Sequence, residues 1–133
     1  MSKLKLAIQK NGRLSEKSLK LLEECGIKIS NGTRKLKAVS TNFPLEILFL
    51  RDDDIPQYVE QGVADIGIIG LNEVLEQKKI IEIVQKLGFA QCRLSLAIPK
   101  EENYNGIPYF ENKKVATSYP EILSNYFQEN NIN

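Results

Sequence analysis

The sequence predicts an α/β fold with a mainly parallel sheet, and three observations support this class. Segments with the apolar pattern of strands alternate with segments that have the spacing of amphipathic helices. The run at 45–50 (LEILFL) is almost entirely apolar, as in strands covered on both faces. The run at 63–70 (VADIGIIG) is β-branched and punctuated by glycines, which is typical of a strand that meets a turn or a ligand. In such folds, ligands bind beyond the carboxyl ends of the strands.

The chain begins with a predicted strand-turn-helix unit. Residues 4–9 have a short strand pattern, and residues 10–13 (KNGR) form a polar turn. Ser15 is of a type that caps helices, so we expect a helix from there to about Cys25. Gly26 follows at the position where a left-handed residue commonly ends a helix.

The middle of the chain continues this alternation. Residues 34–41 alternate weakly and suggest a strand, and a second strand is predicted at 45–50. Three aspartates then precede a helix predicted at about 54–61, where their charges favour the free amides of the first turn. Gly62 ends that helix, and the run at 63–70 is predicted to be a central strand of the sheet.

The pattern divides the chain into two predicted lobes. A helix at 72–78 and a strand at 93–99 complete the first α/β lobe, residues 1–99. The polar stretch that follows interrupts the apolar pattern with turn formers and charges. Residues 100–133 therefore begin a second lobe, which we expect to be incomplete because its strand-helix pair has no following strand to receive the crossover.

The second lobe is predicted to open with a strand at 113–118 and a helix at 119–129. The apolar positions expected on the inner face of this helix are Ile122, Leu123, Tyr126 and Phe127. Ser118 and Glu121 match a capping box, with a proline in the first turn between them. Beyond this structural interpretation, the ring of Tyr119 is suited to stacking on a base.

Composition narrows the possible chemistry. The 18 basic and 17 acidic residues give a formal charge of +1, so no global field favours nucleic acid or an anionic membrane. The absence of histidine excludes Ser-His-Asp and Cys-His nucleophiles and a Cys/His zinc site. Cys25 and Cys92 lack CxxC spacing, which suits a reduced, cytoplasmic setting. The apolar run at the start is too short for a signal peptide, and no run is long enough to span a membrane.

Basic residues flank a glycine at the predicted end of the first strand. Lys10, Gly12 and Arg13 lie there beside the expected amino terminus of a helix, which is suited to anions. The segment matches neither a Walker sequence nor a dinucleotide fingerprint. A polar strand-helix turn with solvent-exposed basic side chains stays the alternative.

Two acidic features allow more than one interpretation. The aspartates of the string RDDDIP are hard oxygen ligands suited to Mg²⁺ arriving with substrate phosphates, but they also suit helix capping. Arg51 could pair with one of them. Asp65 interrupts an apolar stretch and must find donors or meet a ligand. A salt bridge to Arg51 or Arg93 is the structural alternative for Asp65.

Six strings occur in order between about residue 4 and residue 127: IQKNGRLS, CGIKI, NFPLEILFLRDDDIP, GVADIGIIG, GFAQCRLSLAIP and KKVATSYP. Together they resemble the ATP phosphoribosyltransferase family, particularly its long-form members. The resemblance implies a core of two α/β lobes similar to type II periplasmic binding proteins, with substrates between the lobes. It implies the first step of histidine biosynthesis, a glycosyl transfer in which ATP and phosphoribosyl pyrophosphate give phosphoribosyl-ATP and pyrophosphate, with Mg²⁺ required.

The resemblance also implies which residues meet these small-molecule substrates. The first-lobe wall of the nucleotide site is expected at Lys10, Gly12, Arg13 and Leu14. The end of a neighbouring strand is expected to contribute Asp65 and Gly70. The crossing between the lobes and the cleft face of the second lobe are expected at Cys92, Arg93, Ser95 and Tyr119. No catalytic residue or magnesium ligand is identified by these matches.

The carboxyl end departs from the family pattern. Full-length relatives, which are homo-oligomers, continue through a glycine- and threonine-containing phosphoribosyl pyrophosphate loop, and long forms add a histidine-binding regulatory domain. Neither segment has a counterpart in these 133 residues, so we expect a truncated chain that is inactive alone. Two alternatives stay open: a non-catalytic nucleotide- or anion-binding module of the solute-binding-domain type, and a non-functional fragment.

Overall fold

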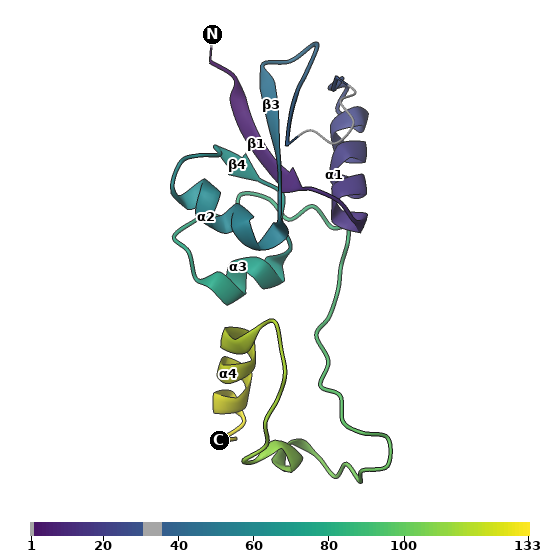
Figure 1. Ribbon diagram of the computed structural model, residues 1–133, viewed down its shortest axis with the longest axis vertical. Coiled ribbons are helices and arrows are strands. Elements are labelled where there is room, and N and C mark those ends of the chain that lie inside the picture. The colour runs from purple at the N-terminus through teal and green to yellow at the C-terminus, as the bar shows by residue number, and fades with distance from the viewer. Residues whose placement is uncertain (1, 31–35) are drawn as a thin grey trace. The chain divides into compact units, whose positions relative to one another are not determined.

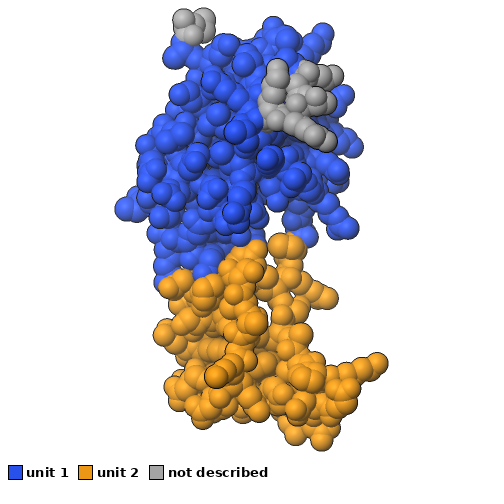
Figure 2. All heavy atoms as spheres, in the orientation of Figure 1, with its two compact units in different colours: residues 1–91 blue, residues 92–133 orange. Residues whose placement is uncertain are grey.

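A computed structural model describes residues 2–30 and 36–133. The chain divides into two compact units, unit 1 (residues 1–91) and unit 2 (residues 92–133) (Figure 2). The lobe boundary between residues 99 and 100 stays a prediction. Unit 1 contains β1 (Leu4–Gln9), α1 (Arg13–Glu24), β2 (Lys37–Val39), β3 (Leu45–Leu50), the 3₁₀ turn η1 (Asp52–Asp54), α2 (Ile55–Glu60), β4 (Ile66–Gly67) and α3 (Leu71–Gln77). Unit 2 contains the 3₁₀ turn η2 (Ile107–Phe110) and α4 (Pro120–Glu129).

The sheet of unit 1 has the strand order β2-β3-β1-β4, and Figure 1 labels β3, β1 and β4. Strands β1 and β3 pair in parallel along their whole length, from Leu4 opposite Leu45 to Gln9 opposite Leu50. Strand β4 is also parallel to β1, whereas β2 is antiparallel to β3. The mainly parallel sheet of an α/β fold is therefore confirmed for the described residues.

The two faces of β1 pack into separate apolar clusters. Leu6 and Ile8 pack with Leu22 of α1, whereas Ala7, which lies between them in the strand, packs with Ile55 of α2. Successive side chains of a strand point to opposite faces, so the two helices must cover opposite sides of the sheet. Figure 1 shows α1 on one side and α2 on the other. This double cover explains why β3 is apolar at nearly every position.

Helix α1 begins at Arg13, directly after Gly12, and not at Ser15. Gly12 has a φ of 101°, which turns the chain straight from the loop into the helix. Ser15 is only 5% exposed, so its side chain faces the protein interior and the predicted cap is wrong. Ser18 is fully buried and donates its hydroxyl to the helix backbone at 2.6 Å. The predicted left-handed residue at the other end is confirmed by Gly26, with a φ of 79°.

The structure confirms some of the strands predicted in unit 1 and contradicts another. The strands predicted at 4–9 and 45–50 are confirmed by β1 and β3. In the segment 34–41, Arg34 and Lys35 lie outside the described residues, and the described strand is β2. The central strand predicted at 63–70 is wrong, because only β4 pairs there and it lies at the end of the strand order.

A cross-strand ion pair joins β2 to β3. Lys37 Nζ lies 2.8 Å from Glu46 Oε1, and the Glu46 side chain is 14% exposed. The hydrogen bond from Lys37 lowers the pKa of Glu46, and the positive charges of Lys37, Lys5 and Lys3 act in the same direction against the opposing effect of desolvation. Opposite charges that face each other across two strands stabilise the pairing modestly.

Every residue of unit 2 is described, and none is in a strand. Helix α4 confirms the helix predicted at 119–129, with Pro120 in its first turn. The strands predicted at 93–99 and 113–118 are wrong, because an alternating pattern forms a strand only where a neighbouring strand accepts its hydrogen bonds. Tyr126 is 45% exposed, so its predicted position on an inner face is also wrong.

Aromatic side chains hold unit 2 together. Phe110 is 4% exposed, and its ring centroid lies 5.2 Å from that of Tyr109 and 5.8 Å from that of Phe127. Tyr104 completes the group at 6.0 Å from Phe110. These separations lie in the range in which aromatic pairs attract beyond simple burial. The small core of unit 2 is therefore built around one phenylalanine.

No helix in the described part of the chain combines the length and the apolar character needed to cross a membrane. Cys25 and Cys92 are both exposed free thiols.

Candidate functional site

The carboxyl ends of β1 and β3 lie side by side at one edge of the sheet. Gln9 is opposite Leu50 in the register, and the Lys10 N–H donates to the Leu50 carbonyl at 2.7 Å. The loop that follows β1 and the acidic turn that follows β3 therefore start at neighbouring positions. Ligands of open α/β sheets bind at this kind of edge, so we take it as the candidate site.

The loop after β1 leads into an uncapped helix amino terminus. Gly12 occupies the N-cap position of α1, which has 12 residues, and no side chain caps the helix. An added Cβ at Gly12 would approach the Gln9 side chain only to 3.8 Å, so the positive φ rather than crowding requires glycine here. Lys10 and Arg13 are exposed on either side of Gly12. Free amides, the positive end of the helix dipole and two cations together favour an anion.

Leu14 has a different position from its basic neighbours. Its side chain is half-buried, and its carbonyl accepts the hydroxyl of Ser18 at 2.6 Å. The residue thus anchors the first turn of α1 beneath the exposed loop. Its expected contact with a nucleotide stays a prediction.

The acidic turn after β3 pairs within itself. Arg51 lies 3.3 Å from Asp53, which confirms the pairing considered from the sequence, and the Asp53 N–H donates to Asp52 Oδ1 at 3.0 Å. Asp54 occupies the N-cap position of α2 but makes no side-chain capping bond, so the predicted aspartate cap is wrong. The three aspartates instead form their own 3₁₀ turn. Among the described residues, no three potential ligands gather as a metal-binding group.

A polar link between α3 and this turn was missed by sequence reasoning. Gln77 Nε2 donates to the Asp53 carbonyl at 2.5 Å and to Glu73 Oε2 at 3.2 Å. Glu73 is 9% exposed, which is unusual for a carboxylate. Its spacing of four residues from Gln77 could have suggested their contact on one helix face, but nothing local could have identified Asp53 as the third partner.

Asp65 lies at the other end of the sheet. Its carboxylate accepts the Lys5 N–H at 2.8 Å, and its own N–H donates to the Lys5 carbonyl at 2.9 Å. Lys5 is near the start of β1, whereas Lys10 follows the end of that strand. The donor predicted for Asp65 is thus a backbone amide, and the residue is exposed rather than enclosed by apolar neighbours. Its predicted contact with substrate is untested.

Gly70 lies beyond the carboxyl end of β4, as the N-cap of α3. An added Cβ there would collide with the Asn72 side chain, so a larger residue would have to displace that amide. Gly70 therefore belongs to the same edge of the sheet as the loop after β1, whereas Asp65 does not.

The expected site residues of unit 2 lie in two places. Cys92, Arg93 and Ser95 are exposed on a segment without regular structure. Tyr119 is half-buried at the N-cap of α4, where no side chain makes a capping hydrogen bond, and its N–H donates to Thr117 Oγ1 at 2.9 Å. The capping box predicted for Ser118 is therefore wrong, because the helix begins one residue later than that motif requires.

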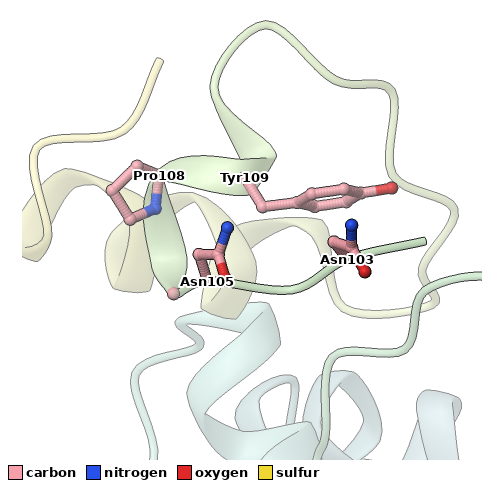
Figure 3. A pocket seen from close by; sticks show the side chains of 5 residues that line it. Asn103, Asn105, Pro108 and Tyr109 are labelled. Carbon is pink, nitrogen blue, oxygen red and sulfur yellow. The ribbon is translucent and has the colours of Figure 1, made fainter.

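Unit 2 also contains a shallow surface hollow of about 240 Å³. Figure 3 shows the ring of Tyr109 near the side chain of Asn103, with Asn105 and Pro108 on the other side of the hollow. Two carboxamides and one aromatic ring can bind a polar ring by hydrogen bonding and stacking. The hollow contains none of the site residues expected from the sequence.

Comparison with known proteins identifies the family. A family model described as HisG: ATP phosphoribosyltransferase matches residues 51–133. The chain is 57% identical over 129 residues to the ATP phosphoribosyltransferase of Cytophaga hutchinsonii and 54% identical to that of Phocaeicola vulgatus, covering 97% of this chain in both cases. It covers 45% and 46% of those proteins, so the chain spans about half the length of the curated relatives it matches.

A solved structure supports the same relationship. The structure is similar to a chain of the ATP phosphoribosyl transferase (HisG:HisZ) complex from Thermotoga maritima, with a TM-score of 0.66 and 28% identity. The match covers 97% of this chain and 60% of that one. Sequence and structure therefore agree that this chain belongs to the ATP phosphoribosyltransferase family.

Proposed function

We propose that the chain provides the nucleotide-binding wall of an ATP phosphoribosyltransferase. The reaction joins ATP to phosphoribosyl pyrophosphate and releases pyrophosphate, the first step of histidine biosynthesis. One observation carries the proposal at the level of residues: Lys10 and Arg13 flank Gly12 at the uncapped start of α1, beside the carboxyl end of β3. Family membership supplies the identity of the anion expected there.

The proposed chemistry requires the protein to position the two substrates and to neutralise the charge of the leaving group. An adenine ring nitrogen attacks the anomeric carbon of the ribose, and the bond from that carbon to the pyrophosphate oxygen breaks. Alignment of the two substrates and neutralisation of the leaving group lower the barrier without a covalent intermediate. Lys10 and Arg13 would bind phosphate oxygens, Arg13 through its planar fork of donors, and the free amides of α1 would add to this field. A chain without histidine can supply all of these interactions.

The proposal extends to the surroundings of this wall. We propose a two-lobed arrangement like that of type II periplasmic binding proteins, with Cys92, Arg93 and Ser95 near the lobe crossing and Tyr119 facing the cleft. A cytoplasmic setting fits ATP as the substrate. Because the chain spans about half of its relatives' length, the activity of the whole enzyme is a proposal for a longer polypeptide, and we propose that these 133 residues alone are inactive.

We propose that Mg²⁺ binds to the protein together with the substrate phosphates. Mg²⁺ is commonly held by one or two carboxylates together with substrate phosphates, and the aspartates after β3 have the oxygen ligands that this ion prefers. Arg51 engages Asp53, and no group of three potential ligands gathers in the described residues, so the substrate phosphates would supply most of the ligands of the ion.

Calorimetry with ATP tests the wall directly. We expect the chain to bind ATP, and we expect Arg13→Ala to weaken that binding about tenfold, as for loss of a hydrogen bond to a charged group. Lys20→Ala is the matched control, because Lys20 is an exposed cation farther along the same helix. Equal ATP affinity in wild type and Arg13→Ala would remove Arg13 from the site.

The second candidate is a non-catalytic anion-binding module, which the uncapped start of α1 between Lys10 and Arg13 would also suit. Such a module would bind tripolyphosphate as tightly as ATP, whereas a nucleotide wall should prefer ATP. A folded chain that binds neither would support the non-functional fragment. Formation of phosphoribosyl-ATP by the purified chain would contradict the proposal that it is inactive alone.

A further inference from the structure

We propose that Asn11 is a site of spontaneous deamidation, and that this reaction places a carboxylate in the loop between β1 and α1. Asn11 is followed by Gly12, which has no side chain to shield its backbone nitrogen. The dipeptide lies between two cations, Lys10 and Arg13. One uncatalysed reaction would therefore change the charge of the loop at its centre.

The structure leaves both reacting groups accessible. Asn11 and Gly12 are exposed and lie outside the helix and the strand. Among the described residues, neither the Asn11 side chain nor the Gly12 N–H has a hydrogen-bond partner. The Gly12 carbonyl accepts the Glu16 N–H at 3.1 Å, which holds the first turn of α1 without engaging the Gly12 nitrogen.

The reaction is balanced with water as the co-reactant. The deprotonated Gly12 nitrogen attacks Asn11 Cγ, a carbon-nitrogen bond forms, and the side-chain nitrogen leaves as ammonia after gaining a proton. Water then adds to one of the two carbonyls of the resulting succinimide, and the ring bond from that carbonyl to nitrogen breaks. The product is aspartate or isoaspartate, in either case with a new carboxylate and a released proton.

A second Asn-Gly dipeptide provides an internal comparison. Gly106, which follows Asn105, has φ 126° and ψ −179°, close to the 101° and −176° of Gly12. The Gly106 carbonyl also accepts an amide, from Tyr109 at 3.1 Å, and Asn105 is exposed at the surface hollow (Figure 3). The two sites thus match in backbone conformation and in the bond made by the glycine carbonyl.

The two dipeptides differ in their electrostatic surroundings. Gly12 begins a helix of 12 residues between Lys10 and Arg13, whereas Gly106 begins a 3₁₀ turn of four residues. The positive end of a helix dipole and nearby cations favour the anionic nitrogen that performs the attack. We therefore expect Asn11 to deamidate about two- to fivefold faster than Asn105, the factor that a helix-terminus interaction supplies.

Peptide mapping by mass spectrometry after incubation in mildly alkaline buffer tests the rate order. The sequence contains a further Asn-Gly dipeptide, Asn31-Gly32, which lies outside the described residues. Peptide mapping distinguishes its deamidation product from those of Asn11 and Asn105. Asn11→Gln should abolish the product at this position and leave the rate at Asn105 unchanged. In urea the ratio of the two rates should fall, because the helix is lost. Absence of product at Asn11, an equal or faster rate at Asn105, or a ratio that urea does not change would overturn the inference.

The effect of deamidation on ATP binding rests on the proposed function, and it is measured separately from the deamidation rate. Asn11→Asp reproduces the aspartate product, and it should weaken ATP binding severalfold by placing a like charge beside the phosphates. Asn125→Asp is the matched control, since it adds the same charge at an exposed position of unit 2 that does not line the surface hollow. If Asn11 deamidates in the expected order but Asn11→Asp binds ATP like wild type, the modification stands and the assigned anion site fails.

Discussion

The strands of unit 1 pair with one another in a sheet, whereas the extended segments of unit 2 pair with no strand. In unit 1, β1 and β3 exchange hydrogen bonds over their full length, and helices cover both faces of the sheet. In unit 2, Leu94 and Leu96 are 51% and 36% exposed on a segment with no strand partner, and burial concentrates at Phe110 and Ile132. Equal apolar content in a segment therefore does not lead to equal burial.

This contrast predicts which part of the chain opens first. Regions with few buried apolar contacts and exposed backbone open locally at a small free-energy cost, whereas a paired and covered sheet opens only with global unfolding. The candidate anion site lies in unit 1, on the paired sheet. A folded site can therefore persist in this chain even where unit 2 is opened.

The largest effect is expected from removing the central aromatic ring of unit 2. Phe110→Ala should destabilise unit 2 by about 3–5 kcal/mol, because the ring is almost fully buried and contacts three others. Four of the five tyrosines lie in unit 2 and only Tyr58 lies in unit 1, so near-ultraviolet circular dichroism reports mainly on unit 2. We expect that signal to fall while the far-ultraviolet signal of the sheet persists.

Two further variants complete this test. Phe43→Ala removes a half-exposed ring from unit 1 and should change stability by only about 0.5 kcal/mol. Ile47→Ala removes a fully buried side chain from β3 and should lower the unfolding free energy of unit 1 by about 2–5 kcal/mol. A Phe110→Ala protein with an unchanged tyrosine signal would contradict the distinction between the units.

The same contrast separates what could be predicted from sequence from what could not. The bounds of β1 and β3, and the positions of α3 and α4, follow from apolar periodicity and glycine or proline boundaries, which are local signals. The strands predicted at 93–99 and 113–118 failed because pairing depends on a neighbour that no local pattern supplies.

The same distinction between local signals and contacts made by the fold applies to the helix starts and to the candidate site. Ser15 and Ser118 are good capping types, but the backbone enters α1 through the left-handed Gly12 and α4 through Tyr119. The basic loop after β1 was predictable because it directly follows a strand. The contact of Gln77 with the Asp53 carbonyl was not, because these residues are 24 positions apart and meet only through the fold.

A smaller effect is expected from Asn42, which joins two backbone segments of unit 1. Its Oδ1 accepts the Lys28 N–H at 2.8 Å, and its Nδ2 donates to the Gly26 carbonyl at 2.7 Å. Asn42→Ala should cost about 0.5–1.5 kcal/mol in denaturant unfolding, because two hydrogen bonds are lost at an exposed position where water can replace the partner. Asn103→Ala is the control in unit 2, where the described residues give that amide no hydrogen bond, and an equal loss in both variants would count against the comparison.

The smallest effect concerns the ion pair between β2 and β3. Lys37 holds the pKa of Glu46 below the ordinary value of 4.5, so the pair contributes stability to unit 1 above that pH and loses it as the pH falls through the lowered pKa. Glu46→Gln should remove this part of the acid dependence, measured by far-ultraviolet circular dichroism during acid titration. Glu129→Gln, at an exposed position in unit 2, should leave the acid midpoint of the sheet unchanged. The effect of Glu46→Gln should be slight, because the Lys37 side chain is 58% exposed and solvent screens the pair. A midpoint shift as large with Glu129→Gln would show that acid unfolding of the sheet does not depend on this local pair.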